Sequence, residues 1–396
     1  MQEEVKMKRH SLTGLILSLV VITACGTVAM ADPPGWRVIQ LTDNSFGDSS
    51  PRVSGSNVAW MGWDGGDYEI FFYNGSTTTQ LTDNSYNDEV PQISGSNIVW
   101  QCNGEIFFYN GSTTNQLTNN SFGDHSPQIS GSNVVWQGGL LGNYEIFFYN
   151  GSTTTQLTDN SISDEYPQIS GSNVAWRGWD GSDWELFFYN GSTTTQLTNN
   201  NYHESTTQIS GSNVVWQEYD GIDFEIFFYN GSTTTQLTNN DYDDIYPQIS
   251  GSNVVWQGWD GSYETWEIFF YNGSTTTQLT NNSFYNAGPQ ISGSNVVWVV
   301  EDGSDWEIFF YNGLTTIQLT DNGYPDGVPQ ISGSNVVWES YNGSDTEILL
   351  AVPCLYAIAG DLNDDCTIDF YDFAMMASNW LIDCVAEPAN PACIPK

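Results

Sequence analysis

The chain has 396 residues, of which 47 are acidic and only 7 are Lys or Arg, so its formal net charge is −40 at pH 7. Nucleic acid and anionic lipid are both bound through clustered cations, and this composition therefore excludes them as partners. The chain has few cations and only 3 His, so it has almost none of the residues needed for a His-containing catalytic triad, a Lys Schiff base or a His metal cluster. The catalytic chemistry that this composition still allows is acid/base catalysis by paired carboxylates.

The first 31 residues have the order of a secretory signal. A basic stretch from Lys6 to Arg9 precedes an apolar run from Leu12 to Ala24, and Ala29-Met30-Ala31 supplies the small residues of a cleavage site. We expect cleavage after Ala31 and a protein that is secreted, periplasmic or held at the cell surface. The stretch that ends at Cys25 also resembles a bacterial lipobox, and a lipoprotein anchored at that residue is the alternative. Without such lipidation we expect no membrane contact.

From Gln40 to about Leu350 one motif is written eight times. Each copy reads approximately PQISGSNVVW, a loop, EIFFYNGSTTT and QLT. Such a repeat decides the fold and is recognised before anything else. Aromatic and β-branched residues dominate each copy while Lys, Glu and Ala are few, which predicts an all-β protein.

We expect four strands in each copy. In the second copy they cover Pro91–Ser94, Asn97–Gln101, Glu105–Tyr109 and Thr113–Thr118. The Asn110-Gly111 pair predicts a tight hairpin between the last two, because both residues tolerate positive φ. The runs Val-Val-Trp and Ile-Phe-Phe-Tyr do not alternate apolar with polar residues, which indicates strands buried on both faces.

A four-stranded antiparallel sheet packed between two sheets like itself is a propeller blade, whereas a solenoid, the alternative, uses shorter units. Residues 36–42 read as a fourth strand without the three that precede it elsewhere. The last copy runs through Trp338 and Glu347–Leu350 and then stops without its Gln-Leu-Thr. We therefore predict an eight-bladed β-propeller over residues 32–352, closed by the N-terminal strand so that no edge stays open. A monomer is expected.

These repeats resemble those of TolB-like bacterial propellers, whose blades carry a Pro-x-x-Ser, an apolar strand, an Asp-Gly turn, an Ile-Tyr-type strand and a closing Leu-Thr. The resemblance covers roughly residues 36–350. It implies the propeller fold. It does not specify a function, because that fold serves binding proteins, peptidase gates and lyases alike.

Strand direction predicts which loops share a face of the propeller. In a four-stranded antiparallel sheet the first-to-second and third-to-fourth turns lie on one face. The second-to-third loops and the blade-to-blade loops lie on the other. The first two turns, Ser-Gly-Ser-Asn and Asn-Gly-Ser-Thr, hardly differ among the copies, whereas the other loops vary and carry aromatic and acidic residues.

We expect the varied loops to form a binding platform. Trp63, Trp179, Trp259 and Tyr219 would stack on sugars or grip the apolar groups of a peptide. The alternative is that these loops differ because nothing constrains them. The tryptophans of the Val-Val-Trp runs are instead expected in the core, and they are Trp60, Trp100, Trp136, Trp176, Trp216, Trp256, Trp298 and Trp338.

No catalytic residue is predicted. A glycoside hydrolase needs two acids about 5 to 9.5 Å apart, but so acidic a chain contains such pairs by chance. His203 and Glu204 in the fifth blade-to-blade loop are the one local irregularity, and a solvated pair accounts for them.

Residues 361–372 match an EF-hand-like calcium loop. Oxygen-bearing side chains stand at positions 1, 3, 5, 9 and 12 of a twelve-residue loop, with an apolar residue at position 8. Two departures are Cys366 at position 6, usually Gly, and Asp rather than Glu at position 12. The alternative is an acidic loop that caps a helix without metal. The predicted calcium ligands are Asp361, Asn363, Asp365, Thr367 through its carbonyl, Asp369 through water, and Asp372.

Asp at position 12, followed by an expected helix over Tyr371–Leu381, resembles a dockerin segment. Dockerins are calcium-loop-plus-helix modules that attach secreted enzymes to cohesin receptors, so the resemblance implies a cohesin-like receptor as a partner of residues 353–396. A dockerin normally has two such segments, and this chain shows one.

In an exported protein the four clustered cysteines of this tail predict disulfides. We favour the pairs Cys366–Cys384 and Cys354–Cys393, because the first would pin the loop to the end of the helix. Cys102 is expected to be unpaired.

The resulting hypothesis is a secreted, non-enzymatic binding or adaptor propeller with a calcium-binding tail for attachment. Its expected ligand is a polysaccharide or an extracellular protein. The alternative is an extracellular polysaccharide-degrading lyase or glycoside hydrolase on the same scaffold. Propeller lyases and sialidases depend on His, Lys or Arg clusters, which this chain lacks.

Overall fold

The structure is a computed structural model that describes residues 32–140, 142–261 and 265–354, together with residues 362, 366, 368, 372–374 and 376. The predicted signal peptide, Cys25 and most of the predicted calcium loop lie outside the described residues. Within the described part, no helix has the length and apolar character needed to cross a membrane.

Within the described residues, thirty-two strands form eight four-stranded antiparallel sheets, as predicted. We number the sheets as blades 1 to 8 in chain order. The first strands of the blades are β2 (Asp48–Ser54), β6 (Asp88–Ser94), β10 (Gly123–Ser130), β14 (Asp164–Ser170), β18 (Glu204–Ser210), β22 (Asp244–Ser250), β26 (Tyr285–Ser292) and β30 (Asp326–Ser332). The second strands are β3 (Asn57–Trp63), β7 (Asn97–Cys102), β11 (Asn133–Leu140), β15 (Asn173–Trp179), β19 (Asn213–Tyr219), β23 (Asn253–Trp259), β27 (Asn295–Glu301) and β31 (Asn335–Tyr341).

The outer half of each blade is built from a longer third strand and a short fourth strand. The third strands are β4 (Tyr68–Tyr73), β8 (Glu105–Tyr109), β12 (Asn143–Tyr149), β16 (Trp184–Tyr189), β20 (Phe224–Tyr229), β24 (Trp266–Tyr271), β28 (Trp306–Tyr311) and β32 (Thr346–Pro353). The fourth strands are β5 (Thr78–Gln80), β9 (Thr114–Gln116), β13 (Thr154–Gln156), β17 (Thr194–Gln196), β21 (Thr234–Gln236), β25 (Thr276–Gln278), β29 (Thr316–Gln318) and, in blade 8, β1 (Trp36–Gln40).

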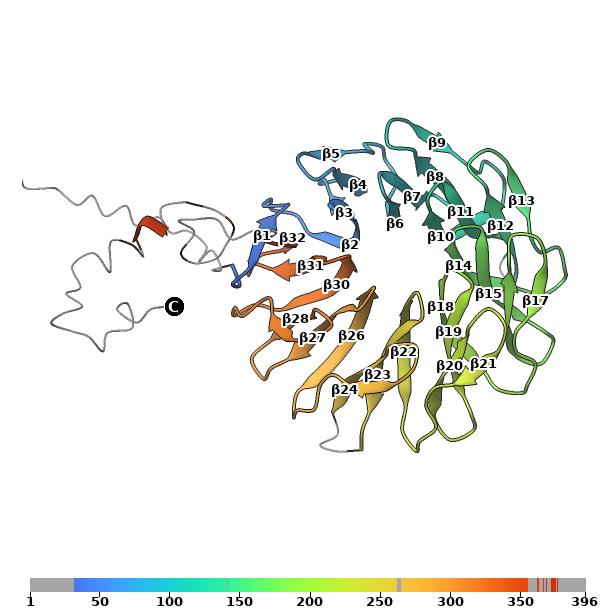
Figure 1. The fold of residues 1–396 in the computed structure, drawn as a ribbon. Helices are drawn as coiled ribbons and strands as arrows, with labels where there is room; N and C mark the ends of the chain where they lie inside the picture. The colour runs from blue at the N-terminus through green and yellow to red at the C-terminus, as the bar shows by residue number, and fades with distance from the viewer. Residues whose placement is uncertain are drawn as a thin grey trace, which may run out of the picture. The chain divides into compact units, whose positions relative to one another are not determined.

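The blades form a closed ring (Figure 1). Neighbouring first strands contact one another in cyclic order, and β30 of blade 8 contacts β2 of blade 1. The closing strand β1 pairs with β32, with Ile39 opposite Leu350. Trp36 is 4% exposed and packs edge-on against Phe310 of blade 7, with ring centroids 4.8 Å apart. The predicted closure by the N-terminal strand is confirmed.

The core lies between neighbouring sheets, where the repeated tryptophans are buried as predicted, each at most 1% exposed. In seven blades the indole stacks on a phenylalanine of its own third strand, as Trp60 does on Phe71 with centroids 5.8 Å apart, and in blade 8 the cross-strand partner of Trp338 is Leu349. Each indole also packs against the preceding blade, as Trp256 of blade 6 does against Val215 and Phe228 of blade 5. Burial of this much aromatic surface is the main favourable term that holds the blades together.

Two predicted strand boundaries need correction. The first strand of blade 2 starts at Asp88 rather than Pro91, because a β-bulge with Val90 at φ 56° lets pairing resume on the far side of the proline. The fourth strand covers only Thr114–Gln116, since Thr118 uses its hydroxyl rather than its backbone to accept the N–H of Ile106.

The disulfide prediction was wrong. Cys354, just past the end of β32, is bonded to Cys366, with their Cα atoms 5.4 Å apart. The backbone N–H of Cys354 donates to the carbonyl of Gly35, so its position is fixed by the closing strand. Cys384 and Cys393 lie outside the described residues. Cys102 is free and buried, as expected.

Candidate functional site

The two predicted kinds of loop do gather on one face. The N–H of Trp63 donates to the carbonyl of Gly47, and the N–H of Trp179 donates to that of Ser163, so second-to-third loops meet blade-to-blade loops. We call this side the varied face. Its described residues are those of the blade-to-blade loops 41–47, 81–87, 117–122, 157–163, 197–203, 237–243, 279–284 and 319–325 and those of the second-to-third loops at 64–67, 103–104, 142, 180–183, 220–223, 260–261, 265, 302–305 and 342–345.

The opposite face is held by one hydrogen-bond pattern repeated around the ring. The Asn57 amide donates to the carbonyl of Gly95 in the next blade, and the N–H of Gly95 donates to the hydroxyl of Ser54. The same pair of bonds joins blade 8 to blade 1, where Asn335 donates to Gly55 and Gly55 to Ser332. The constancy of these turns therefore has a structural cause.

An exposed aromatic residue recurs in the blade-to-blade loops, and sequence reasoning did not single it out. It stands two residues after an asparagine that recurs in all eight loops, and seven of the eight loops carry it. Each of these side chains is 37–56% exposed. They are Phe46, Tyr86, Phe122, Tyr202, Tyr242, Phe284 and Tyr324, with Ile162 at the equivalent place in the remaining loop.

The loop asparagine holds each of these loops in one conformation. In the loop before blade 6, Asn240 Oδ1 accepts the N–H of Tyr242 at 2.7 Å. Its Nδ2 donates to Asp244, and its own N–H donates to Glu225 Oε1. A loop fixed by three such bonds loses little further entropy when a ligand binds to its exposed ring.

The aromatic residues predicted as ligand contacts lie on this face but are less exposed than expected. Trp63, Trp179 and Trp259 are half-buried, because each packs against an aromatic neighbour. Trp63 packs against Tyr68 and Trp179 against Trp184, their cross-strand partners, with centroids 5.2 and 5.5 Å apart. Trp259 packs against Tyr242 of the neighbouring loop, with centroids 5.0 Å apart. Tyr219 is 39% exposed. Their role in ligand binding stays a prediction.

Three cavities have residues of the varied-face loops in their lining. One, of about 670 Å³, lies between blades 7 and 8 and is lined by Trp306, Tyr341, Val328 and Pro329 among others. A second, about 370 Å³, is bordered by Tyr86 and His125. The third, about 300 Å³, is bordered by Phe46 and Trp63. Exposed rings beside such hollows are typical of ligand-binding surfaces.

Beneath the varied face each core tryptophan is tied to a buried carboxylate or amide. In blade 3 the Trp136 Nε1–H donates to Asp124 Oδ1 at 3.0 Å, and the Asn120 amide donates to Asp124 Oδ2 at 2.7 Å. Burial raises the pKa of Asp124, and these hydrogen bonds act in the opposite direction. This layer connects the loops to the core, so it positions the face rather than forming part of it.

Blade 5 departs from this pattern at the residue noted in the sequence. Glu204 replaces the usual aspartate, and Glu218 stands where other blades have a small residue and accepts the Trp216 Nε1–H at 3.1 Å. Asn200 donates to both carboxyl groups, at 3.0 and 3.1 Å. Burial, followed by the charge of Glu218, raises the pKa of Glu204 to about 8. Of the predicted solvated pair, His203 is exposed but Glu204 is 1% exposed, contrary to the prediction for that residue. The contacts of Glu204 and Glu218 are those of the structural layer in the other blades.

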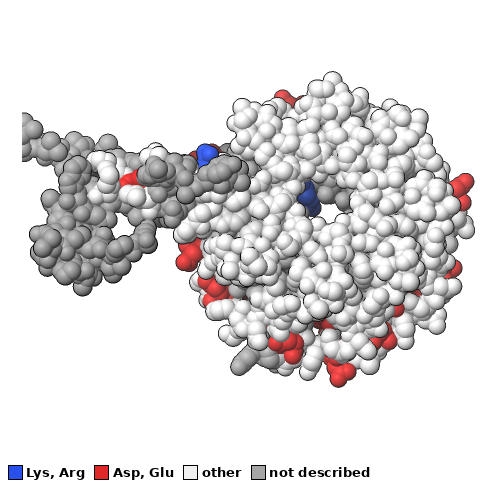
Figure 2. Space-filling view, viewed as in Figure 1, with Lys and Arg blue, Asp and Glu red and all other residues white. Residues whose placement is uncertain are grey.

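The described cations lie apart from the aromatic loops or are already engaged. Arg52, on the innermost strand of blade 1, donates to Gln92 and has its pKa lowered by burial. Arg177 pairs with Glu165 at 3.2 Å and sits 4.4 Å from the ring centroids of both Tyr166 and Trp184. Figure 2 shows one side of the ring, with a central hollow and acidic groups along the outer rim.

Comparisons with known proteins place the fold but not the activity. No protein-family model and no curated protein matches the sequence. Among solved structures, the designed Ika8 protein is similar at 16% identity and a TM-score of 0.55, over 78% of this chain and 98% of that one. A structure of prolyl endopeptidases matches 75% of this chain and 54% of its own, at 9% identity and a TM-score of 0.53.

The propeller domain of the Trilobed protease from Pyrococcus furiosus is also similar, at 13% identity and a TM-score of 0.50, over 71% of this chain and 97% of that one. The chain shares the β-propeller fold. At the level of fold this agrees with the resemblance of the repeats to TolB-like propellers. That archaeal domain is described as having an open velcro topology, whereas here β1 closes the ring.

Proposed function

We propose that this chain is a non-enzymatic binding protein that recognises a neutral polysaccharide through the varied face. The observation that carries the proposal is the ring of exposed aromatic side chains, repeated in seven of eight loops and held by the same asparagine clamp. Flat aromatic faces bind sugars by stacking, and a repeated arrangement suits a ligand that is itself a repeating polymer. Each weak contact then adds to the avidity of the whole.

A cationic protein segment is the second candidate, and the net charge of −40 favours it. Charge attraction of this kind raises association rates at low salt and is largely screened at about 0.5 M NaCl, whereas stacking is not. Binding that survives such salt supports the polysaccharide, and binding that disappears supports the cationic protein.

The test replaces Tyr86, Phe122 and Tyr324 by alanine in one variant and measures binding on an array of glycans and cell-wall fractions. Because these rings are exposed, we expect at least a tenfold loss of affinity for the ligand that the native protein binds, with little change in melting temperature. The matched control is Leu314→Ala, which removes an exposed apolar side chain from the opposite face and should bind normally. Native affinity in the triple variant would leave the platform proposal without support.

We further propose that residues 361–372 bind one calcium ion and that the tail serves for attachment to a cohesin-like receptor. Of the predicted ligands only Asp372 is described. It is 3% exposed and accepts the N–H of Leu362 at 2.5 Å, which brings the two ends of the expected loop together. Cys366, at the position usually held by Gly, has a φ of 66°, the left-handed conformation that this turn of an EF-hand loop needs. Both observations support the calcium proposal.

Replacing Asp361 by alanine removes the first ligand and should lower the calcium stoichiometry of the full chain by one, as measured by calorimetry. The control is Asp321→Ala, an exposed aspartate of the propeller. Equal calcium uptake by Asp361→Ala and the native chain would contradict the tail site.

A further inference from the structure

Four second-to-third loops each bring three carboxyl groups together. The residues follow the spacing Asp-x-x-Asp-x-Glu, and in each cluster one oxygen of every side chain lies within 4.8 Å of the others. We call them the loop triads. They are Asp64, Asp67 and Glu69 in blade 1; Asp180, Asp183 and Glu185 in blade 4; Asp220, Asp223 and Glu225 in blade 5; and Asp302, Asp305 and Glu307 in blade 7.

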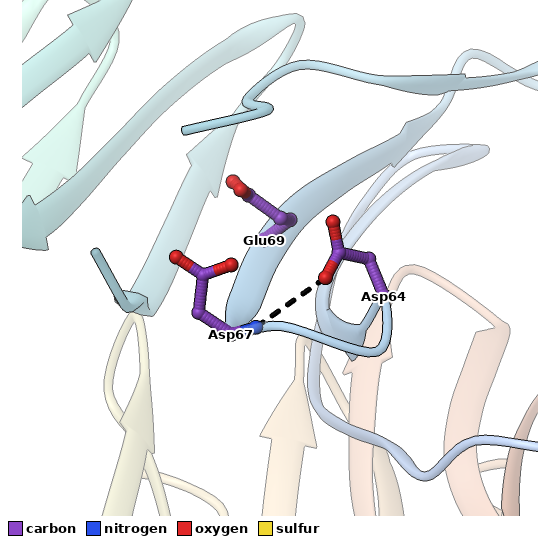
Figure 3. A group of neighbouring side chains, drawn as sticks. All are labelled: Asp64, Asp67 and Glu69. Carbon is purple, nitrogen blue, oxygen red and sulfur yellow. Dashed lines mark hydrogen bonds between the residues drawn. The ribbon is translucent and has the colours of Figure 1, made fainter. Parts of the chain in front are cut away.

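The turn explains only part of this arrangement. In blade 1, Asp64 Oδ1 accepts the N–H groups of Gly66 and Asp67, as an aspartate commonly does in a turn. Figure 3 shows the carboxyl groups of Asp64, Asp67 and Glu69 on the same side of this turn. Because the carboxylate of Asp64 alone accepts these two N–H groups of the turn, that of Asp67 is not needed to form it. The three like charges nevertheless lie together.

In three of the four triads the middle aspartate is buried with at least one carboxylate oxygen that has no hydrogen-bond partner, and in blade 7 the half-buried Asp305 also has one such oxygen. Asp223 is 6% exposed, and neither of its carboxylate oxygens has a hydrogen-bond partner. Asp67 and Asp183 are 9% and 4% exposed, and each has one buried oxygen with no partner. A carboxylate oxygen shielded from water without a donor or a cation is unfavourable, so a further group is expected to neutralise it.

Blade 8 contains the same loop with one change, and there the carboxylates do have a hydrogen-bond donor. Asn342 stands in place of the first aspartate. Its Oδ1 accepts the same two turn N–H groups, from Ser344 and Asp345. Its amide nitrogen donates to Asp345 Oδ1 at 2.7 Å and to Glu347 Oε1 at 3.1 Å. A donor bridging the two remaining carboxylates thus takes the place that a cation would occupy in the loop triads.

We propose that the four loop triads are calcium sites. All of their ligand atoms are carboxylate oxygens, which suit a hard divalent cation, and no His or Cys belongs to them. Two oxygens bound to one calcium at about 2.4 Å lie at most about 4.8 Å apart, so each triad is compact enough to hold one ion. Mg²⁺ keeps several of its waters and is seldom held by a group of protein carboxylates alone. In blade 5 further acids, Asp241 and Asp243, lie near Asp223 and add to its negative surroundings.

The proposed sites also connect neighbouring blades. The glutamate of each triad accepts the N–H of the next loop asparagine through Oε1, as Glu185 does from Asn200 and Glu225 from Asn240. That asparagine is the clamp of the aromatic loops. A cation at a triad would therefore fix the glutamate and, through it, the following loop.

The test uses the full chain with Asp361→Ala, so that the tail does not contribute. After EDTA treatment and dialysis, calorimetry with CaCl₂ at pH 8 should count four ions per chain, the number of triads. Calcium should also raise the melting temperature by at least about 5 °C relative to EDTA. No uptake by this protein, or an equal rise with MgCl₂, would overturn the proposal.

The decisive variant changes Asp64, Asp180, Asp220 and Asp302 to asparagine and so copies the arrangement of Asn342. We expect it to bind no calcium and to melt at the same temperature in calcium and in EDTA. The matched control changes Asp43, Asp83, Asp159 and Asp321, four exposed loop aspartates, to asparagine, which other blades carry at the same position. This control should still bind four ions. Four ions bound to the first variant, or fewer to the control, would contradict the assignment.

If the fourfold variant fails to fold, single changes carry the test. Asp180→Asn and Asp302→Asn should each lower the stoichiometry by one. Trp184 and Trp306 stand in the sequence between the second aspartate and the glutamate of their triads. When Tb³⁺ replaces calcium, each change should therefore also remove part of the Tb³⁺ luminescence that is excited through tryptophan. Unchanged stoichiometry and luminescence in both variants would overturn the proposal.

Discussion

A chain that lacks residues 32–42 should melt at least about 10 °C below the chain that starts at residue 32. The deletion removes β1, which supplies the fourth strand of blade 8. It takes Trp36 out of a core shared with blades 7 and 8, and loss of such a buried tryptophan alone costs roughly 3–5 kcal/mol. It also takes away Thr42, whose hydroxyl accepts the N–H of Ile348. The exposed edge of β32 should in addition promote aggregation.

Two point variants separate packing from truncation. Trp36→Ala should reproduce a large part of the loss, because the side chain is 4% exposed. Arg37→Ala, at an exposed position of the same strand, should melt like the parent. Thermal unfolding followed by circular dichroism and light scattering measures both effects. A truncated chain that melts with the parent would refute the stabilising role of the closure.

Asp124→Ala should destabilise the protein by roughly 1–3 kcal/mol, because it leaves the buried Trp136 Nε1–H without an acceptor. The substitution also removes the acceptor of the exposed Asn120 amide, which can turn to water instead. Asp124→Asn should be far milder. Blade 7 carries Asn286 at this position, and its Oδ1 accepts the Trp298 Nε1–H at 3.3 Å.

The same pair of variants predicts a pH dependence. Burial raises the pKa of Asp124 above its ordinary value of 3.8, and the charge of Glu105 acts in the same direction. The folded state therefore binds this proton more tightly than the unfolded state. The resulting stability is present at acid pH and is lost as the pH rises through the folded-state pKa.

Asparagine does not titrate, so the melting temperature of Asp124→Asn relative to the native protein should increase from pH 4 to pH 8. Unfolding scans at several pH values in EDTA measure this difference. A constant difference across that range would show that Asp124 does not titrate with folding, and a mild effect of Asp124→Ala would contradict its role as an acceptor.

Most of the fold could be predicted from the sequence repeat. The spacing of Gln-Leu-Thr, the orphan strand at residues 36–42 and the incomplete last copy together predicted the number of blades, the strand order and the closure, because each depends only on counting strands. Boundaries were less accurate. Val90 adopts φ 56° before a proline, and the sequence alone gives no reason to expect a bulge there.

The candidate site was predicted as a face but not as residues. Strand parity placed the varied loops together, yet Trp63 and Trp179 are half-buried because their cross-strand partners happen to be aromatic. The exposed aromatic residues such as Tyr86 and Phe122 could have been predicted from a sequence pattern, because they stand at a fixed position two residues after the loop asparagine. The Asp-Gly of the second-to-third loops was interpreted as turn chemistry, which holds for Asp64 but leaves Asp67 unexplained.

The closing pair β1–β32 joins residues more than 300 positions apart, whereas the other strand pairs join residues of one copy. During synthesis, β1 leaves the ribosome first and its partner leaves after the whole ring. Blades 1 to 7 can each pair their own strands as soon as their copy is complete, while Trp36 and Ile39 must wait without a partner. Blade 8 is therefore the last blade to form although its strand β1 is synthesised first. The time for which the apolar side chains of β1 stay exposed is set by the time needed to synthesise the other seven blades.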